Sequence, residues 1–220
     1  MDLFTLMRSR HSVRSYLDKP IEEEKKTVLL RAIDEINHGT GLRFQLFTEE
    51  PEAFAANAAH YGAFRGCRNY FALVGPRGKE EAVGYWGQKL VLLAQELGLN
   101  TCWVALTYKK GKVAVNPAAG EKLHIVIALG YGADPGVPHK SKPIEKIAAV
   151  SPDDPQWFRS GLEAALLAPT AINQQQFFFR RAGSTVSVRA KPGPCSRIDL
   201  GIVKYQFELG AGAENFRWEA

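Results

Sequence analysis

The stretch EEAVGYWGQKLVLLAQEL, residues 80–97, decides how the rest of the sequence is organised. Its helical spacing places apolar residues on nearly every face: Trp86, Leu90, Leu93 and Leu97 on one, and Val91, Leu92 and Ala94 on others. A helix that is apolar all round is buried in a protein core. Residues 98–100, Gly-Leu-Asn, end it. The sequence therefore predicts one buried central helix.

Apolar strands are expected on both sides of this helix. Residues 69–75 form a run of aromatic and aliphatic side chains without polar alternation, and residues 101–106 and 123–129 follow the helix with similar runs. Continuous apolar runs of this length are typical of strands that are covered on both faces. These segments are expected to form the centre of a sheet.

The remaining elements alternate between helix and strand. Asp2 is expected to cap the first helix, and a basic stretch at residues 8–14 follows it. Helices packed on a mixed or antiparallel sheet, either α+β or α/β, explain this order, and we expect the α+β class. Further helices are expected at residues 2–7, between Pro20 and His38, and at 51–59, 156–167 and 198–210, and further strands at 43–47, 176–181, 185–190 and 216–218.

Composition is typical of a soluble globular protein. The chain has 220 residues, of which 45% are hydrophobic and 23% charged, so it can bury a core without disulfides or a metal. A formal charge of +5 favours anionic ligands. Three scattered cysteines, together with the absence of a signal peptide or an apolar run of membrane-spanning length, predict a cytoplasmic protein that is neither secreted nor in a membrane.

A weak internal repeat suggests two related halves. A shift of 132 residues aligns residues 29–47 with residues 161–179 without a gap and places Pro20 on Pro152. Helix-turn-strand units of equal length produce such a pattern by chance as well. We interpret the repeat as a duplication: an N-terminal half, residues 1–150, and a shorter C-terminal half, residues 151–220, packed into one pseudo-symmetric unit.

Three polar segments are candidates for chemistry. Residues 8–14, RSRHSVR, bring guanidinium and hydroxyl groups together in a combination that suits a phosphate. Residues 139–142, HKSK, lie in an irregular loop, and residues 168–176, APTAINQQQ, place amides between a helix and a strand. Amides donate and accept hydrogen bonds, so they can bind the edge of a ring. Solvated loops and a polar helix cap remain the plain alternatives.

Common catalytic and metal-binding motifs are absent. The sequence contains no GxGxxG, GxxxxGK, GxSxG, HExxH or CxxC, and its five histidines lack metal-ligand spacing. We therefore expect no metal site and no hydrolytic triad.

Four short motifs resemble those of the FMN-dependent nitroreductase family. RHSVR at residues 10–14 is similar to its Arg-x-Ser-x-Arg signature, and PTAINQQ at residues 169–175 is similar to Pro-Ser-x-x-Asn-x-Gln, with Thr170 in place of Ser. LGLNTCW at residues 97–103 and KSKP at residues 140–143 match two further motifs of the family, except for Asn100. The resemblance covers most of the chain.

The resemblance implies a role for each matching residue. Positive and hydroxyl side chains would neutralise the FMN phosphate, the amide motif would contact the flavin ring and ribityl chain, and residues 100–103 would face the isoalloxazine. No side chain need act as acid or base, because the flavin carries the hydride. The implied cofactor-binding residues are Arg10, His11, Ser12, Arg14, Asn100, Thr101, Cys102, Trp103, Lys140, Lys142, Pro169, Thr170, Ala171, Asn173 and Gln175.

The order of the motifs differs from that of the family. The amide motif usually lies in the first third of each subunit, and two subunits share the flavin, whereas here it lies at residues 169–175. The chain looks like a short, internally duplicated branch, a fused pseudo-dimer that acts as a monomer. The motifs for a second site are missing, so one FMN per chain is expected.

The implied activity is hydride transfer from NADH or NADPH through FMN to a small electron-poor acceptor, a nitroaromatic or a quinone. A flavin- or nucleotide-binding protein without turnover is the first alternative. A basic nucleic-acid-binding module is the second, supported by the positive charge alone. Under the leading hypothesis, the FMN-dependent oxidoreductase, we expect neither a nucleic-acid partner nor a membrane partner.

Overall fold

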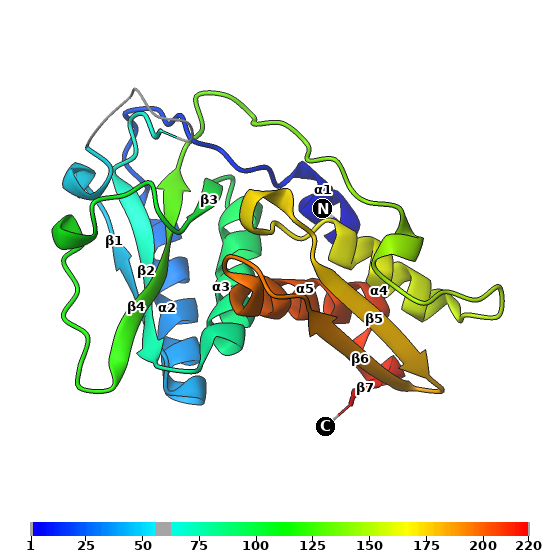
Figure 1. Cartoon of the computed structure of the whole chain (residues 1–220). Helices are drawn as coiled ribbons and strands as arrows, with labels where there is room; N and C mark the ends of the chain where they lie inside the picture. Colours follow the sequence, from blue (N-terminus) through cyan, green and yellow to red (C-terminus); the bar gives the residue numbers. More distant parts are fainter. Residues whose placement is uncertain (1, 56–62, 220) are drawn as a thin grey trace. The chain divides into compact units, whose positions relative to one another are not determined.

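The computed structural model describes residues 2–55 and 63–219, and its main elements follow the order expected from the sequence (Figure 1). The fold is α+β, as expected. The helices are α1 (Leu3–Ser9), α2 (Glu23–Thr40), α3 (Glu80–Glu96), α4 (Gln156–Leu166) and α5 (Ser196–Ala211). The strands are β1 (Arg43–Phe47), β2 (Asn69–Pro76), β3 (Asn100–Val104), β4 (Glu121–Gly130), β5 (Phe177–Ala182), β6 (Thr185–Ala190) and β7 (Arg217–Trp218).

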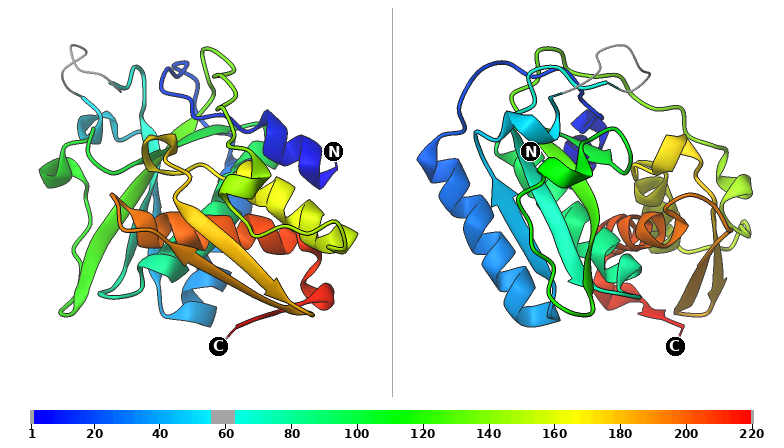
Figure 2. Two further views of the ribbon diagram at one scale, coloured as in Figure 1. Left: turned by 45° about the vertical axis from the view of Figure 1, so that its right-hand side comes forward. Right: turned by 60° about the vertical axis from the view of Figure 1, so that its left-hand side comes forward.

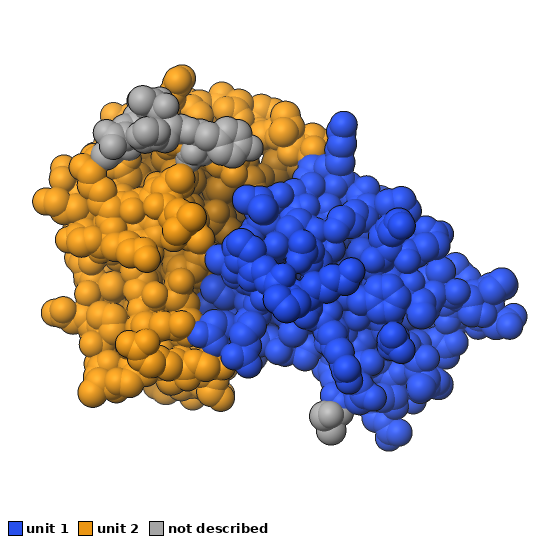
Figure 3. Space-filling view, viewed as in Figure 1, with its two compact units in different colours: residues 1–9, 80–89, 139–220 blue, residues 10–79, 90–138 orange. Residues whose placement is uncertain are grey.

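The chain divides into two compact units that are interleaved along the sequence (Figure 3). Unit 1 consists of residues 1–9, 80–89 and 139–220, and unit 2 consists of residues 10–79 and 90–138. The boundaries of these units do not coincide with those of the halves expected from the repeat, 1–150 and 151–220, and those halves stay a prediction. The duplication itself stays a prediction.

Unit 2 is built on a four-stranded antiparallel sheet with strand order β1-β2-β4-β3. Strands β2 and β4 form its centre, and their apolar runs are buried as the sequence predicts. Helix α2 packs beside β1 and buries Leu29, Ile33 and Ile36 (Figure 2). The Asn37 side chain joins helix and strand, since it accepts from the Phe44 amide at 2.8 Å and donates to the Phe44 carbonyl at 3.0 Å.

Unit 1 combines helices α4 and α5 with a three-stranded sheet of order β5-β6-β7. Strands β5 and β6 are antiparallel, and β6 and β7 are parallel, so this sheet is mixed. Helices α4 and α5 approach closely at Gly210, which has no side chain. A Cβ at this position would lie only 2.5 Å from the Ala164 Cβ. Aromatic rings fill the core: Phe179 and Phe207 stack with centroids 4.7 Å apart, and Phe158 meets Phe207 edge to face.

One expected element differs in the structure. The helix expected at residues 51–59 is a single 3₁₀ turn at Pro51–Ala53, because proline starts a turn that Phe54 ends, and residues 56–59 lie outside the described residues. Helix α4 ends at Leu166, well before strand β5, whereas α2 runs almost directly into β1. The two aligned segments thus share their element order but not their loop length.

Within the described residues, no helix is both long and apolar enough to cross a membrane.

Candidate functional site

The basic segment, defined here as residues 10–14, is held against strand β3 in unit 2. Ser12 forms a parallel bridge with Thr101, and the Val13 amide donates to the Thr101 carbonyl at 3.1 Å. Further along the chain, the Tyr16 hydroxyl donates to the Val13 carbonyl at 2.8 Å. The structure therefore brings together two of the predicted motifs, RHSVR and the start of β3.

Arg10 is the unusual residue of the basic segment. Its side chain is only 4% exposed, and its Nε atom has no hydrogen-bond partner among the described residues. Burial lowers the pKa of the guanidinium to about 10, although it stays protonated at neutral pH. A buried cation without a partner is unfavourable unless an anion joins it. This position therefore fits a bound anionic group.

His11 shows a related arrangement. Its Nδ1 lies 2.8 Å from the Pro135 carbonyl oxygen, which fixes the ring, while its buried Nε2 has no partner within the described chain. Gly136 allows this approach, because a Cβ there would lie 2.8 Å from the His11 Cβ. Arg14, by contrast, is exposed. Arg10 and His11, two of the predicted cofactor-binding residues, thus each keep one buried nitrogen atom without a partner in the described chain.

The side chains of the predicted β3 residues are mostly buried beneath the basic segment and leave little surface for a ligand. Thr101 and Cys102 are 1% and 2% exposed, and Trp103 is half-buried. Burial raises the pKa of the Cys102 thiol, opposed by Arg14, Ser12 and Arg10, so this cysteine is a structural thiol. The Asn100 side chain accepts a hydrogen bond from the Gly132 amide at 2.9 Å. The departure from the family motif at Asn100 thus ties β3 to the segment after β4.

The amide loop, defined here as residues 169–175, lies in unit 1 and has an unusual backbone. Ile172, Asn173 and Gln175 have φ values of 47°, 54° and 43°, in the left-handed region. Ile172 is also 86% exposed. A β-branched residue rarely adopts positive φ, so the surrounding contacts must stabilise this conformation.

Those contacts use the amide side chains themselves. Asn173 Nδ2 donates to the Lys140 carbonyl at 3.0 Å, and Gln175 Nε2 donates to the same carbonyl at 2.8 Å and to Asn173 Oδ1 at 2.7 Å. Gln175 Oε1 accepts from the Lys142 amide at 2.9 Å, and Thr170 Oγ1 accepts from the Gln175 amide at 3.0 Å. The structure therefore joins the amide loop to residues 140–142.

The two predicted lysines differ. Lys142 Nζ donates to the Gln174 and Gln175 carbonyls at 2.6 and 3.1 Å, so its charge stabilises the amide loop. Lys140 is exposed, and its ammonium has no partner in the part of the chain that the structure describes. Lys140 is therefore the freer of the two for an anion.

Asp199, on α5, is a residue that the sequence analysis missed. It is 7% exposed, and its carboxylate accepts hydrogen bonds from the Ala171 amide and from Gln174 Nε2. Burial raises its pKa to about 6 against the opposing effect of these bonds. The signal was present, because Asp199 is a lone carboxylate among the apolar residues of Ile198–Val203.

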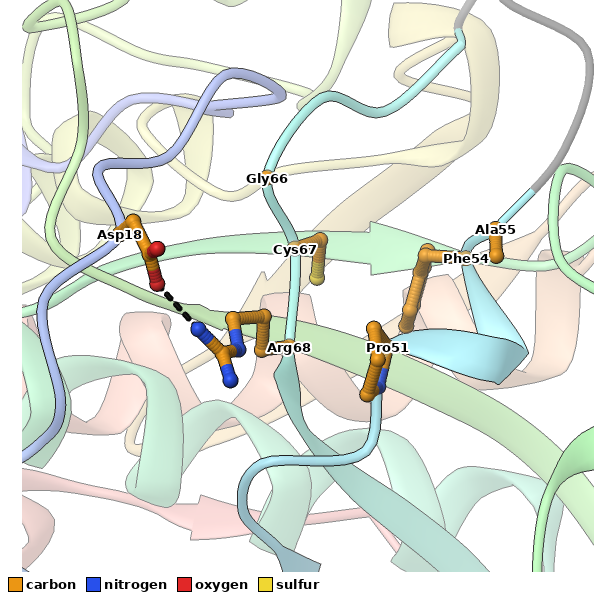
Figure 4. Close-up of a pocket in the computed structure, with 7 residues that line it drawn as sticks. All are labelled: Asp18, Pro51, Phe54, Ala55, Gly66, Cys67 and Arg68. Atoms are coloured by element: carbon orange, nitrogen blue, oxygen red, sulfur yellow. Dashed lines mark hydrogen bonds and ion pairs between the residues drawn. The ribbon is translucent and has the colours of Figure 1, made fainter.

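A pocket of about 380 Å³ in unit 2 contains none of the predicted residues (Figure 4). It is lined by Phe54, Cys67 and Arg68 among others, and Arg68 pairs with Asp18 and, at 2.6 Å, with Glu49. Burial raises the pKa of Cys67 to about 12, so its thiol is unreactive. In the described part of the chain, no group of histidine, cysteine or acidic residues could hold a metal ion.

The family described as "Putative TM nitroreductase" matches residues 2–211. The chain belongs to this nitroreductase family. The resemblance expected from the four motifs is thereby confirmed at the level of the family. No curated protein matches the chain.

Solved structures of nitroreductases share this fold. A putative nitroreductase from Thermotoga maritima has a TM-score of 0.68 and 21% identity, over 97% of this chain and 85% of that one. A putative nitroreductase from Desulfovibrio desulfuricans, solved in complex with FMN, has a TM-score of 0.53 and 21% identity, over 66% of this chain and 94% of that one. A protein from Bacteroides thetaiotaomicron described as a putative NADH dehydrogenase/NAD(P)H nitroreductase has a TM-score of 0.51 and 23% identity, with the same coverage.

Proposed function

We propose that this member of the nitroreductase family is an FMN-dependent oxidoreductase that takes hydride from NADH or NADPH and reduces a small electron-poor acceptor, a nitroaromatic or a quinone. The observation that carries the proposal is Arg10, a buried guanidinium whose Nε has no partner in the described chain. An FMN phosphate would satisfy that cation. The related proteins described with FMN and with NAD(P)H support the choice of cofactor and donor.

The chain's own residues would bind and orient the cofactor. Arg10, Ser12 and Arg14 would neutralise the phosphate, with Lys140 as a further cation. The amide loop would present a fixed backbone, because the side chains of Asn173 and Gln175 already hold it in place. Bound FMN supplies the hydride chemistry, so no side chain needs to act as a general acid or base.

An absorbance spectrum tests the proposal directly. The protein is incubated with excess FMN, unbound flavin is removed, and bands near ~375 and ~450 nm report what remains. We expect one FMN per chain, and we expect the chain to act as a monomer. Retention of no flavin would reject the proposal, and two flavins per chain would reject the single site.

Turnover separates an enzyme from a flavin-binding protein. Oxidation of NADH and of NADPH is followed with a nitroaromatic and with a quinone as acceptor. Retained flavin with consumption of a nicotinamide supports the enzyme. Retained flavin without consumption of either donor favours the binding protein without turnover.

A hollow on the sheet of unit 1 favours a second candidate, nucleic-acid binding. It measures about 510 Å³ and is lined by Phe178, Arg180, Ser187, Arg189, Lys191 and Glu219. Arg180 lies 5.8 Å from the centre of the Phe178 ring, and the three cations have no acidic partner among the described residues. Cations beside an aromatic ring suit single-stranded nucleic acid. Binding of an oligonucleotide that weakens steeply with salt and is reduced by Arg189→Ala would support this role.

A further inference from the structure

The backbone of the amide loop needs external support. Three of its seven residues adopt positive φ without being glycine: Ile172, Asn173 and Gln175. The left-handed conformation destabilises an ordinary residue, so it persists only where surrounding bonds favour it. The loop is also largely free of regular hydrogen bonding, since it contains only one 3₁₀ turn, Ala171–Asn173.

Asp199 supplies this support at the start of the loop. Both of its carboxylate oxygens lie 3.1 Å from the Ala171 amide nitrogen, and its Oδ2 accepts a hydrogen bond from Gln174 Nε2 at 2.7 Å. Gln174 Nε2 also donates to the Pro194 carbonyl at 2.7 Å. The carboxylate therefore bonds to residues on both sides of Ile172 and Asn173.

Lys142 supports the end of the loop in the complementary way. Its ammonium donates to the Gln174 and Gln175 carbonyls, whereas Asp199 accepts from an amide N–H and a side-chain N–H. One anion and one cation thus fix the loop from opposite ends. Asp199 is the more critical of the two, because it is 7% exposed and water cannot readily replace its bonds.

We propose that Asp199 is a positioning residue for the cofactor: without touching it, the carboxylate holds residues 171–174 in the conformation that receives the flavin. This inference rests on the proposed function. Because Asp199 acts through hydrogen bonds to two N–H groups, only an acceptor of similar shape can replace it. Asparagine cannot, since its amide would direct an NH₂ group toward one of these donors.

Hydrogen exchange of the cofactor-free protein tests whether Asp199 holds the amide loop in its conformation. The variant Asp199→Asn is compared with the wild type and with Glu163→Gln, which removes an exposed charge from α4 in the same unit. Exchange in a peptide covering residues 169–176 is expected to be about tenfold faster in Asp199→Asn and unchanged in Glu163→Gln. Equal exchange in all three proteins would overturn the proposal.

FMN affinity tests whether that conformation of the amide loop is needed to bind the cofactor. Asp199→Asn is expected to raise the FMN dissociation constant about tenfold, and Gln174→Ala, which removes one of the bonds to Asp199, about threefold. Circular dichroism checks that Asp199→Asn folds. If it does not, Gln174→Ala replaces it as the test variant. Faster exchange with an unchanged dissociation constant would overturn the positioning role alone. Failure of the wild type to bind FMN would overturn the proposed function and the positioning role with it.

Discussion

The basic segment and the amide loop, which we propose as flavin-binding segments, are built in opposite ways. The basic segment keeps two buried nitrogen atoms, Arg10 Nε and His11 Nε2, without partners in the described chain. In the amide loop, the side chains of Asn173, Gln174 and Gln175 all form hydrogen bonds within unit 1. The first segment has capacity left for a ligand, and the second has used its side chains to fix its own shape.

The difference separates two ways of binding. A buried, unpaired guanidinium gains most of its hydrogen bonds when an anion arrives, so it contributes affinity directly. A loop whose side chains are already bonded contributes a fixed backbone, which lowers the entropy lost on binding. Substitutions in the basic segment should therefore change affinity more than stability. Substitutions around the amide loop should change stability first.

The largest effect is expected from Asp199 and pH. Its pKa is raised to about 6 by burial, so the folded state binds the proton more tightly than the unfolded state does. The contribution of the protonated carboxyl group to the free energy of unfolding is therefore fully present below the unfolded pKa of about 4. It is lost as pH rises through about 6. A shift of this size corresponds to about 3 kcal/mol in the free energy of unfolding.

Urea denaturation between pH 4 and pH 8 measures this effect in the wild type and in Asp199→Asn. Other groups titrate in both proteins and cancel in the difference between the two curves. The wild type should lose about 2 kcal/mol relative to Asp199→Asn over this range, because part of the effect already lies below pH 4. Parallel curves would show that Asp199 has an ordinary pKa in the folded state.

The second effect is expected from Arg10→Met, which keeps the apolar stem and removes the charge. Loss of a charge-assisted contact should raise the FMN dissociation constant about 30-fold, corresponding to about 2 kcal/mol. The free energy of unfolding of the cofactor-free protein should not fall, because the guanidinium Nε has no partner to lose among the described residues. Flavin titration and urea denaturation measure the two quantities.

Arg31→Met is the matched control for Arg10→Met, because Arg31 is an exposed arginine on α2. It should change neither quantity. An unchanged FMN affinity in Arg10→Met would remove Arg10 from the site. A large loss of stability there would mean that the basic segment resembles the amide loop, and the contrast between them would disappear.

Most of the fold could be predicted from the sequence. The apolar runs of β2, α3 and β4 contribute many buried residues to the core, and such runs are recognisable without knowledge of their partners. The division into units could not be predicted. Helix α3 is continuous in sequence, yet residues 80–89 belong to unit 1 and the rest of the helix to unit 2. No change of composition marks that point.

The site could be predicted only at the level of residue types. The motifs identified Arg10, Asn173 and Gln175, but whether a side chain is free or already bonded depends on residues far away in sequence. Gln175 binds the Lys140 carbonyl, 35 positions away, and Asp199 binds Gln174, 25 positions away. The left-handed backbone of Ile172 had no signal either, since isoleucine disfavours that conformation.

The third effect is expected from Lys142→Met, with Lys140→Met as its control. The Lys142 ammonium donates to two carbonyls of the amide loop, so its loss should lower the free energy of unfolding by about 1 kcal/mol. Lys140→Met should leave stability unchanged, because the Lys140 ammonium has no partner among the described residues. Urea denaturation at pH 8 compares the two. Equal stabilities would show that Lys142 is solvated.

The smallest effect has the opposite sign. Ile172→Gly relieves a left-handed conformation that is unfavourable by about 1–2 kcal/mol for a residue with a side chain, and loses about 0.5–1 kcal/mol through the greater entropy of unfolded glycine. The net result should be a gain of about 0.5–1 kcal/mol in the free energy of unfolding. The side chain is 86% exposed, so little packing is lost.

Ile172→Ala is the control for this gain, because alanine shortens the side chain but keeps a Cβ at positive φ. At an ordinary surface position the alanine variant is the more stable of the two. At residue 172 the order should reverse, with the glycine variant unfolding at the higher urea concentration. If Ile172→Gly is more stable yet binds FMN more weakly, the left-handed conformation is maintained for the ligand and not for the fold. If Ile172→Gly is the less stable variant, residue 172 is not strained, and the amide loop needs no support from Asp199.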